Sequence, residues 1–272
     1  MADSNDITGL QQPKILLNQY GDNLQEGEAF VADHLFSYLV SGTQEVWSGN
    51  ETYTFQAGDF RFFKRNQLTK YVKRPGQSGF RSVAVHLDQG TLREMADQYR
   101  DTRPSHYTGK DIVLLRPGTL LESYANSLAP YTQTHGPLEQ ALVALKAQEL
   151  VLLLLQTHPL LKAALFDFDA PGKIDLVAFM QTHYRYNVGL DRMAFLTGRS
   201  LSTFKRDFQK TFNSTAGRWL TQKRLEEAHY LLTEKGQAPS AIYLDLGFED
   251  LSHFSFAYKK AFGKAPSQTG LS

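Results

Sequence analysis

Apolar residues recur at helical spacing twice near the carboxyl terminus, fifty residues apart. Leu201, Phe204, Phe208 and Phe212 lie at positions i, i+3, i+7 and i+11, and the matching positions from 251 to 262 carry Leu, Phe, Tyr and Phe. This spacing places the apolar side chains along one stripe of an α-helix. A repeat with a fixed period marks a duplicated structural unit. We therefore predict two equivalent amphipathic helices, 201–212 and 250–262, each docked on a small core.

Turn and capping residues frame both predicted helices. Gly198 and Gly247 occupy the preceding turns, and Ser200 and Asp250 stand directly before the helices, where an N-cap oxygen is preferred. Two helices joined by a short turn that contains glycine form a helix-turn-helix. The pattern predicts two such units. The further helices that we predict around them cover 173–185, 190–197, 215–233, which links the two units, and 239–246.

A different pattern runs through the first third of the chain, where short β-branched and aromatic segments alternate with turns. The strands predicted there cover 30–40, 45–47, 51–55, 60–63, 71–73 and 80–87. Many short strands favour a sandwich, a jelly roll or a barrel. The helices predicted after them cover 91–100, 120–131 and 138–156. Residues 1–25 are expected to be a flexible arm. The Pro171-Gly172 pair favours a boundary between a β-rich domain, 26–170, and an all-α domain, 171–272.

Charge divides along the same boundary. The full chain has a net charge of +1, but residues 171–272 carry 14 Lys and Arg against 9 Asp and Glu, so the excess of basic residues lies in this part. A basic carboxyl-terminal domain on a mildly acidic remainder indicates a nucleic-acid module attached to something else. The absence of cysteine excludes disulfides, thiol nucleophiles and Cys-ligated metal. The polar amino terminus and the short apolar runs predict a cytoplasmic protein with no membrane segment.

The carboxyl-terminal third resembles the DNA-binding region of the AraC family of bacterial transcription regulators. Residues 246–254 read LGFEDLSHF and residues 258–267 read YKKAFGKAPS, which is similar to the family pattern Gly-Phe-x5-Phe followed by Phe-Lys-x3-Gly-x2-Pro. The segment 224–228, RLEEA, is similar to the family's Arg-Leu-x-x-Ala on the linking helix. The chain departs from the pattern at Tyr243 and at Phe256, where the family usually has alanine and a basic residue. The β-rich domain, with Ala57-Gly58-Asp59, resembles the cupin-like sensor domain of these regulators.

The resemblance implies binding to double-stranded DNA in two successive major grooves and contact with RNA polymerase. The first unit is expected to carry most of the sequence specificity, because Arg206 can grip guanine with two hydrogen bonds. The second unit is expected mainly to anchor. Arg224 has an alternative, a structural pair within the helix bundle. The DNA-binding residues that we predict are Ser202, Thr203, Lys205, Arg206, Ser252, His253, Ser255, Lys259, Lys260, Arg218, Lys223 and Arg224.

The β-rich domain is expected to sense a signal, to mediate dimerisation, or both. Alternation places His34, Phe36 and Tyr38 on one face, where with Trp47 they are candidates for a ligand pocket or for ordinary core. His34 and His86 stand apart, with no His-x-His pair, so we predict no metal, no cofactor and no catalytic residue. A cupin-type enzyme with a DNA-binding tether is the alternative reading. The basic cluster Lys64, Arg65, Lys70, Lys73 and Arg74 is either a solvated rim or an attractor for an anionic ligand or an acidic partner.

The remaining expectations concern partners. The helical segment 120–157 is the candidate surface for a homodimer, because its last helix becomes apolar all round. The signal is expected to be a small-molecule effector or a regulatory protein, and the overall sign of regulation is expected to be activation.

Overall fold

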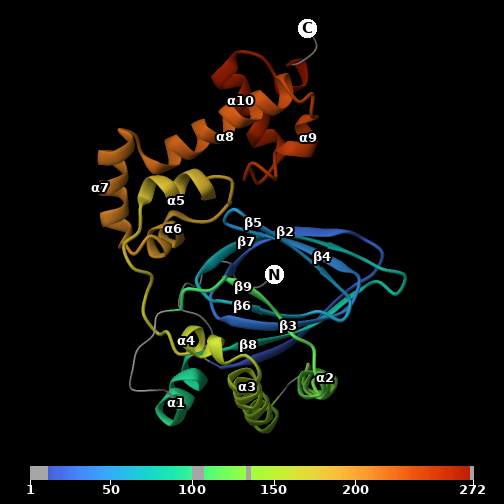
Figure 1. Ribbon diagram of the computed structural model, residues 1–272. Coiled ribbons are helices and arrows are strands. Elements are labelled where there is room, and N and C mark those ends of the chain that lie inside the picture. The colour runs from blue at the N-terminus through green and yellow to red at the C-terminus, as the bar shows by residue number, and fades with distance from the viewer. Residues whose placement is uncertain (1–11, 100–106, 133–135, 270–272) are drawn as a thin grey trace. The chain divides into compact units, whose positions relative to one another are not determined.

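The computed structural model describes residues 12–99, 107–132 and 136–269, and the chain divides into two compact units (Figure 1). The N-terminal unit is Met1–Asp169 and the C-terminal unit is Ala170–Ser272. Each unit has buried hydrophobic residues of its own. The first eleven residues, which belong to the predicted arm, lie outside the described residues, as do 270–272 of the predicted DNA-binding domain.

The N-terminal unit is a sandwich of two antiparallel sheets. One sheet has the order β1-β8-β3-β6-β9 and the other has the order β2-β7-β4-β5. The strands are β1 (Lys14–Tyr20), β2 (Gln25–Val31), β3 (His34–Ser41), β4 (Thr43–Ser48), β5 (Glu51–Gln56), β6 (Phe60–Phe63), β7 (Gln67–Arg74), β8 (Phe80–Leu87) and β9 (Ile112–Leu115). Between the sheets, Leu39 and Phe63 of the first sheet meet Val46 and Phe55 of the second.

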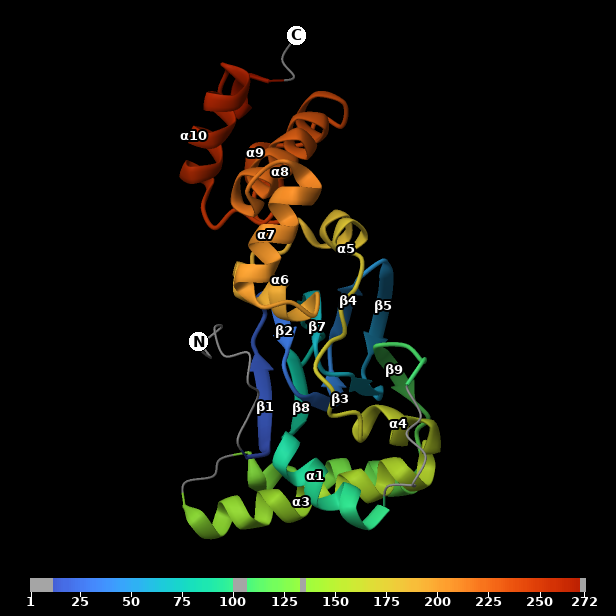
Figure 2. The ribbon, with the colours of Figure 1, turned by 90° about the vertical axis from the view of Figure 1, so that its left-hand side faces the viewer.

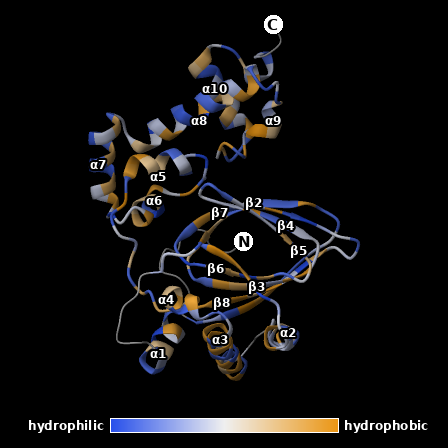
Figure 3. Cartoon of the chain, viewed as in Figure 1, coloured by the Kyte–Doolittle hydropathy of each residue, from blue (hydrophilic) through white to orange (hydrophobic). Residues whose placement is uncertain are grey.

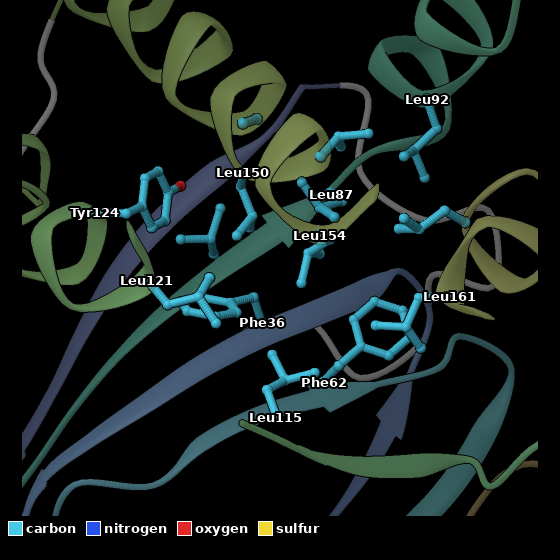
Figure 4. Close-up of a cluster of buried hydrophobic side chains, with 14 of the residues drawn as sticks. Phe36, Phe62, Leu87, Leu92, Leu115, Leu121, Tyr124, Leu150, Leu154 and Leu161 are labelled. Carbon is cyan, nitrogen blue, oxygen red and sulfur yellow. The ribbon is translucent and has the colours of Figure 1, made fainter. Parts of the chain in front are cut away.

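Helices cover the other face of the five-stranded sheet. They are α1 (Gln89–Tyr99), α2 (Thr119–Asn126), α3 (Pro137–Thr157) and α4 (Lys162–Leu165). Figure 2 shows α1 and α3 beneath the sheet that contains β8 and β3. The core of this layer is formed where Leu150 and Leu154 of α3 pack with Phe36 of β3 and Leu87 of β8 (Figure 4). All four side chains are buried, so this helix layer anchors the sheet.

The sequence predictions for this unit need four corrections. The predicted arm is wrong from residue 14 onward, because β1 pairs with β8 from Lys14 to Tyr20 and β2 begins at Gln25. The single strand predicted at 30–40 is two strands, β2 and β3, which belong to different sheets. The helix predicted at 120–131 ends at Asn126 and is followed by a 3-10 turn at Ala129–Tyr131. The strand β9 was not predicted. Arg100, the end of another predicted helix, lies outside the described residues.

The C-terminal unit is all helical. Its elements are α5 (Leu176–His183), α6 (Leu190–Leu196), α7 (Leu201–Phe212), α8 (Ala216–Thr233), α9 (Pro239–Ile242), α10 (Leu251–Phe262) and a 3-10 turn at Pro266–Gln268. The helices predicted from the apolar stripe are confirmed, with α10 beginning one residue later than expected. The helix predicted at 239–246 is shorter, because after Ile242 the hydrogen bonds change from the helical pattern to turns that lead into Gly247.

Candidate nucleic-acid interface

The helices α7 and α10 are capped and buried in the same way. The Ser200 hydroxyl accepts a hydrogen bond from the Thr203 amide at 3.3 Å, and the Asp250 carboxylate accepts one from the His253 amide at 2.6 Å. Both predicted N-caps are therefore confirmed. Phe204 and Phe208 of α7 are fully buried, as are their counterparts in α10. With these side chains turned inward, the opposite face of each helix is open to solvent.

The open face of α7 carries the basic side chains that we predicted for it. Ser202, Lys205 and Arg206 are exposed and Thr203 is half-buried. The Arg206 side chain is 76% exposed, and its Nε makes only a loose approach to the Asp207 carboxylate, at 3.8 Å, among the described residues. Its guanidinium therefore keeps its donors available for a ligand outside the unit.

The open face of α10 carries small, polar and basic side chains around one aromatic ring. Ser252, His253, Lys259 and Lys260 are exposed and Ser255 is half-buried. Phe256 is 71% exposed. The two lysines lie in the last turn of the helix, so the basic charge of this face gathers at one end.

The three predicted DNA-binding residues of the linking helix α8 differ in whether their side chains are available to a ligand. Arg218 is exposed and Lys223 is half-buried, with a long 4.0 Å approach to Glu226. Arg224 instead donates from Nε to the Tyr184 carbonyl at 2.7 Å, and from its two Nη atoms to the Gly247 and Tyr186 carbonyls at 2.8 Å each. The structure thus favours the alternative reading of Arg224 as a structural residue. It joins the chain after α5 to the turn before α10.

A second internal arginine was not predicted. The Arg199 guanidinium donates to the Asp207 carboxylate at 3.1 Å and to the backbone carbonyls of Ile174 and Thr197 at 3.0 and 2.7 Å. Hydrogen bonds from Arg199 and then from Lys173 lower the pKa of Asp207. This contact holds the start of the first unit against α7. Arg199 lies in the turn before the N-cap of α7, so no helical spacing in the sequence signals its pairing with Asp207.

The two turn glycines are required by the backbone. Gly198 has a φ of +65° and Gly247 a φ of +79°, in the left-handed region that side chains disfavour. A Cβ on Gly247 would lie 2.4 Å from the Arg185 carbonyl oxygen and 2.8 Å from the Arg224 guanidinium carbon. The turn before α10 can therefore pass close to α8 only with glycine at this position.

In the N-terminal unit the four candidate pocket residues do not come together. His34 and Phe36 are fully buried on the helix-covered face of β3, and Tyr38 packs on the same core. Trp47 belongs to β4 in the other sheet, where its neighbour Val46 takes the inward position. Of the two alternatives, the structure favours ordinary core for His34, Phe36 and Tyr38, and Trp47 does not join them. Alternation along one strand does not show which face meets which sheet.

The sandwich interior contains two cations instead. Arg61 is 1% exposed and donates to Gln44 and Ser37, at 2.7 Å each. Its guanidinium carbon lies 5.0 Å from the ring centre of Phe55 and 5.9 Å from that of Phe63. Its Nε has no hydrogen-bond partner. Burial lowers the pKa of Arg61 to about 10.

Lys73 lies beside this arginine on the second sheet. Its register partner on β4 is Gln44, which accepts from Arg61, and its ammonium lies 4.7 Å from the ring centre of Tyr71 and 5.5 Å from that of Phe80. Burial and then the charge of Arg61 lower the pKa of Lys73 to about 8. Other members of the predicted basic cluster have partners: Lys64 with Asp111, Lys70 with Glu28 and Arg74 with Glu45. Among the described residues, neither Arg61 nor Lys73 forms a salt bridge.

The residues that the structure describes form neither a candidate metal site nor a membrane-spanning helix. No group of three His, Asp or Glu side chains there is placed to hold a metal ion. The buried His34 ring stacks on Phe62, and its Nδ1 accepts a hydrogen bond from the Arg65 amide at 3.2 Å. None of the helices described combines the length and the hydropathy needed to cross a membrane.

Comparison with known proteins finds a matching family model for part of each unit. A family model described as a helix-turn-helix domain matches residues 193–270, and one described as the ExsA N-terminal regulatory domain matches residues 34–163. The virulence regulon transcriptional activator VirF of Yersinia enterocolitica is 26% identical over 249 residues, covering 86% of this chain and 88% of VirF. The HTH-type transcriptional regulator ExsA of Pseudomonas aeruginosa is 29% identical over 235 residues, covering 85% of this chain and 84% of ExsA. Apo ToxT from Vibrio cholerae aligns over 96% of this chain and 97% of its own, at 11% identity and a TM-score of 0.48.

Proposed function

The chain belongs to the AraC family of transcription regulators, and from this premise we propose that α7 and α10 bind successive major grooves of one DNA duplex. The protein is a DNA-binding transcription activator with an N-terminal regulatory domain, and not an enzyme. Contact with RNA polymerase and action in the cytoplasm belong to the same proposal. The observation that carries it is the pair of helices α7 and α10, each capped by the side chain directly before it and each with an open polar or basic face.

The linking helix supports this arrangement. The 18 residues of α8 span roughly 27 Å at 1.5 Å per residue. Major grooves on one face of DNA repeat every ~34–36 Å. A helix of this length, joined to both flanks through Arg224, is suited to hold two recognition helices at about one turn of DNA. The exposed Arg218 and the half-buried Lys223 on it would contact phosphates.

Hydrogen-bonded reading of bases is proposed for the first unit. Arg206 is the exposed arginine of α7, and a bidentate contact with guanine contributes roughly 1–3 kcal/mol of discrimination. The lysines of α10 lie at the end of the helix and suit phosphates. Arg206→Ala should relax base preference, whereas Lys259→Ala should weaken all sequences alike and reduce the salt slope by about one. Titration of selected and scrambled duplexes tests this, and equal losses on both duplexes for both variants would contradict it.

A homodimer through α3 is proposed for the N-terminal unit. Leu138, Leu142, Leu145 and Leu152 are 74, 40, 60 and 42% exposed, at heptad spacing along this helix. Much of α3 has the colour of hydrophobic residues in Figure 3. These leucines all lie on α3, so within the expected dimer segment 120–157 we propose α3 as the contact surface. Residues 133–135 of that segment lie outside the described residues. Leu145→Glu should convert a dimer to a monomer in light scattering, while Leu160→Glu, at an 84% exposed leucine outside α3, should not. A dimer that survives Leu145→Glu would contradict the assignment.

The signal is proposed to reach the N-terminal unit as a small molecule or as a partner protein. The buried Arg61 and the half-buried Lys73 support an anion as the small molecule, because neither forms a salt bridge among the described residues and a cation removed from water without a paired anion is unfavourable. A ligand at 100 times its Kd adds about 2.7 kcal/mol of stability. Thermal unfolding against organic carboxylates and phosphates, with sugars as the neutral comparison, tests this. No shift with any class would favour a protein signal.

A further inference from the structure

Phe256 stands at the centre of the open face of α10. The buried residues of this helix are Phe254 and Tyr258, and at 100° per residue Phe256 lies on the opposite side from both. It is 71% exposed, more than any other large aromatic side chain in the described part of the chain. Its own unit therefore does not use it for packing.

The surroundings of Phe256 are those of a nucleic-acid contact. One helical turn away on the same face lie Ser252 on one side and Lys259 and Lys260 on the other. The serine is small enough to let the helix approach a groove, and the exposed lysines match the charge of phosphates. In the fifty-residue repeat Phe256 corresponds to Arg206, which is 76% exposed on α7. The position that presents a guanidinium in the first unit presents a phenyl ring in the second.

A phenyl ring can distinguish only certain features of a base pair. It has no hydrogen-bond donor or acceptor, so it cannot replace an arginine at the O6 and N7 atoms of guanine. The 5-methyl group of thymine is the apolar group that bases present in the major groove, and apolar side chains such as Phe contact it. Cytosine lacks this methyl, and burying the ring against polar base edges would leave those edges without hydrogen bonds.

We propose that Phe256 packs on thymine methyl groups in the major groove and makes the second unit selective for an A·T pair. The inference rests on the proposed placement of α10 in DNA. The second unit then reads sequence as well as anchoring the protein, through apolar contact rather than hydrogen bonds. Arg206 and Phe256 divide the operator into a half-site that requires guanine and a half-site that requires thymine.

The test replaces thymine by uracil, which removes the methyl group and keeps every hydrogen-bonding atom. The full-length protein first selects its site from random duplexes. Each thymine of the second half-site is then replaced singly by uracil, and affinity is measured by fluorescence anisotropy. Loss of one buried methyl should weaken wild-type binding about fourfold at one or two positions. Phe256→Ala should bind the thymine and uracil duplexes equally, and Phe256→Arg should change the selected base at that position to guanine.

Two comparisons make the outcomes distinct. Tyr230→Ala removes another exposed aromatic ring, on α8, and should keep the difference between thymine and uracil. Because Phe256 is exposed, its alanine variant should melt at the wild-type temperature. Specific binding that is indifferent to uracil throughout the second half-site overturns the role of Phe256 and leaves the DNA-binding function intact; a phenyl ring reserved for a protein partner gives this result. The absence of any sequence-specific binding by the wild type would overturn both proposals.

Discussion

Arg224 offers the most direct test of how the two helix-turn-helix units are held together. Its guanidinium donates to three backbone carbonyls at 2.7, 2.8 and 2.8 Å, two of them before α8 in the sequence and one after it. A hydrogen bond from a charged group contributes roughly 1.5–3 kcal/mol. Three bonds at the lower limit give about 4–5 kcal/mol, and water reaching this half-buried site should recover part of that. We expect Arg224→Met to lower the free energy of unfolding of the C-terminal unit by about 3 kcal/mol.

The position of the tryptophans makes this measurable in the full-length chain. Trp219 on α8 packs on Phe208 and Phe212, with ring centres 5.8 and 4.8 Å apart, so its fluorescence follows the C-terminal unit. The other tryptophan, Trp47, is removed as Trp47→Phe in all variants. In urea, the midpoint of the Trp219 transition should fall for Arg224→Met.

The same background carries the controls. Arg224→Lys keeps the charge but not the three-directional fork, so its loss should be smaller, at about 2 kcal/mol. Arg218→Met, an exposed arginine on the same helix, should stay within about 0.5 kcal/mol of the parent. Equal stability of Arg224→Met and Arg218→Met would refute the reasoning, because the three carbonyl contacts would then contribute nothing net.

Three further changes have expected outcomes. Burial, then the charges of Arg65 and Lys64, lower the pKa of His34 to about 3, well below the ~6.5 of an unfolded chain. The unfolded state therefore binds the proton more tightly than the folded state. The free energy of unfolding of the N-terminal unit should be at its full value above pH 6.5 and should fall by roughly 2 kcal/mol by pH 5. The slope of the urea midpoint against pH should flatten in His34→Gln, and an unchanged slope would show that another group is responsible. Gly247→Ala should destabilise the C-terminal unit by more than ~1 kcal/mol, since both the positive φ and the close Arg185 carbonyl oppose a Cβ, and wild-type melting of this variant would contradict the turn geometry. Asp250→Ala should cost about 1 kcal/mol through loss of the cap, with Asp250→Asn retaining most of it in the same melting assay.

Local patterns were sufficient for the recognition helices. For each helix, the glycine, the capping residue and the apolar stripe lie within sixteen residues, from Gly198 to Phe212 and from Gly247 to Phe262, and α7 and α10 form where they predict. The same use of local patterns failed for residues 14–20, which were predicted as part of a flexible arm and form β1. Leu16 and Leu17 of β1 are 42 and 39% exposed, so β1 lacks the alternation of buried apolar and exposed polar residues that predicts a strand. It is a strand because β8 supplies its hydrogen bonds from residues 60 to 72 positions away in the sequence.

Which side chains are available to DNA depends on contacts between residues that are far apart in the sequence. Arg206 and Arg224 look alike in the sequence, as arginines on basic helices. One is open to solvent, and the other is bonded to carbonyls 23, 38 and 40 residues away. In the N-terminal unit, the period of two grouped His34, Phe36 and Tyr38 correctly on one face but left open which layer covers it; α3 supplies that layer. Periodicity and capping act through neighbouring residues, so the chain encodes them locally. Which cation is paired and which face is covered depend on partners that only folding brings into contact.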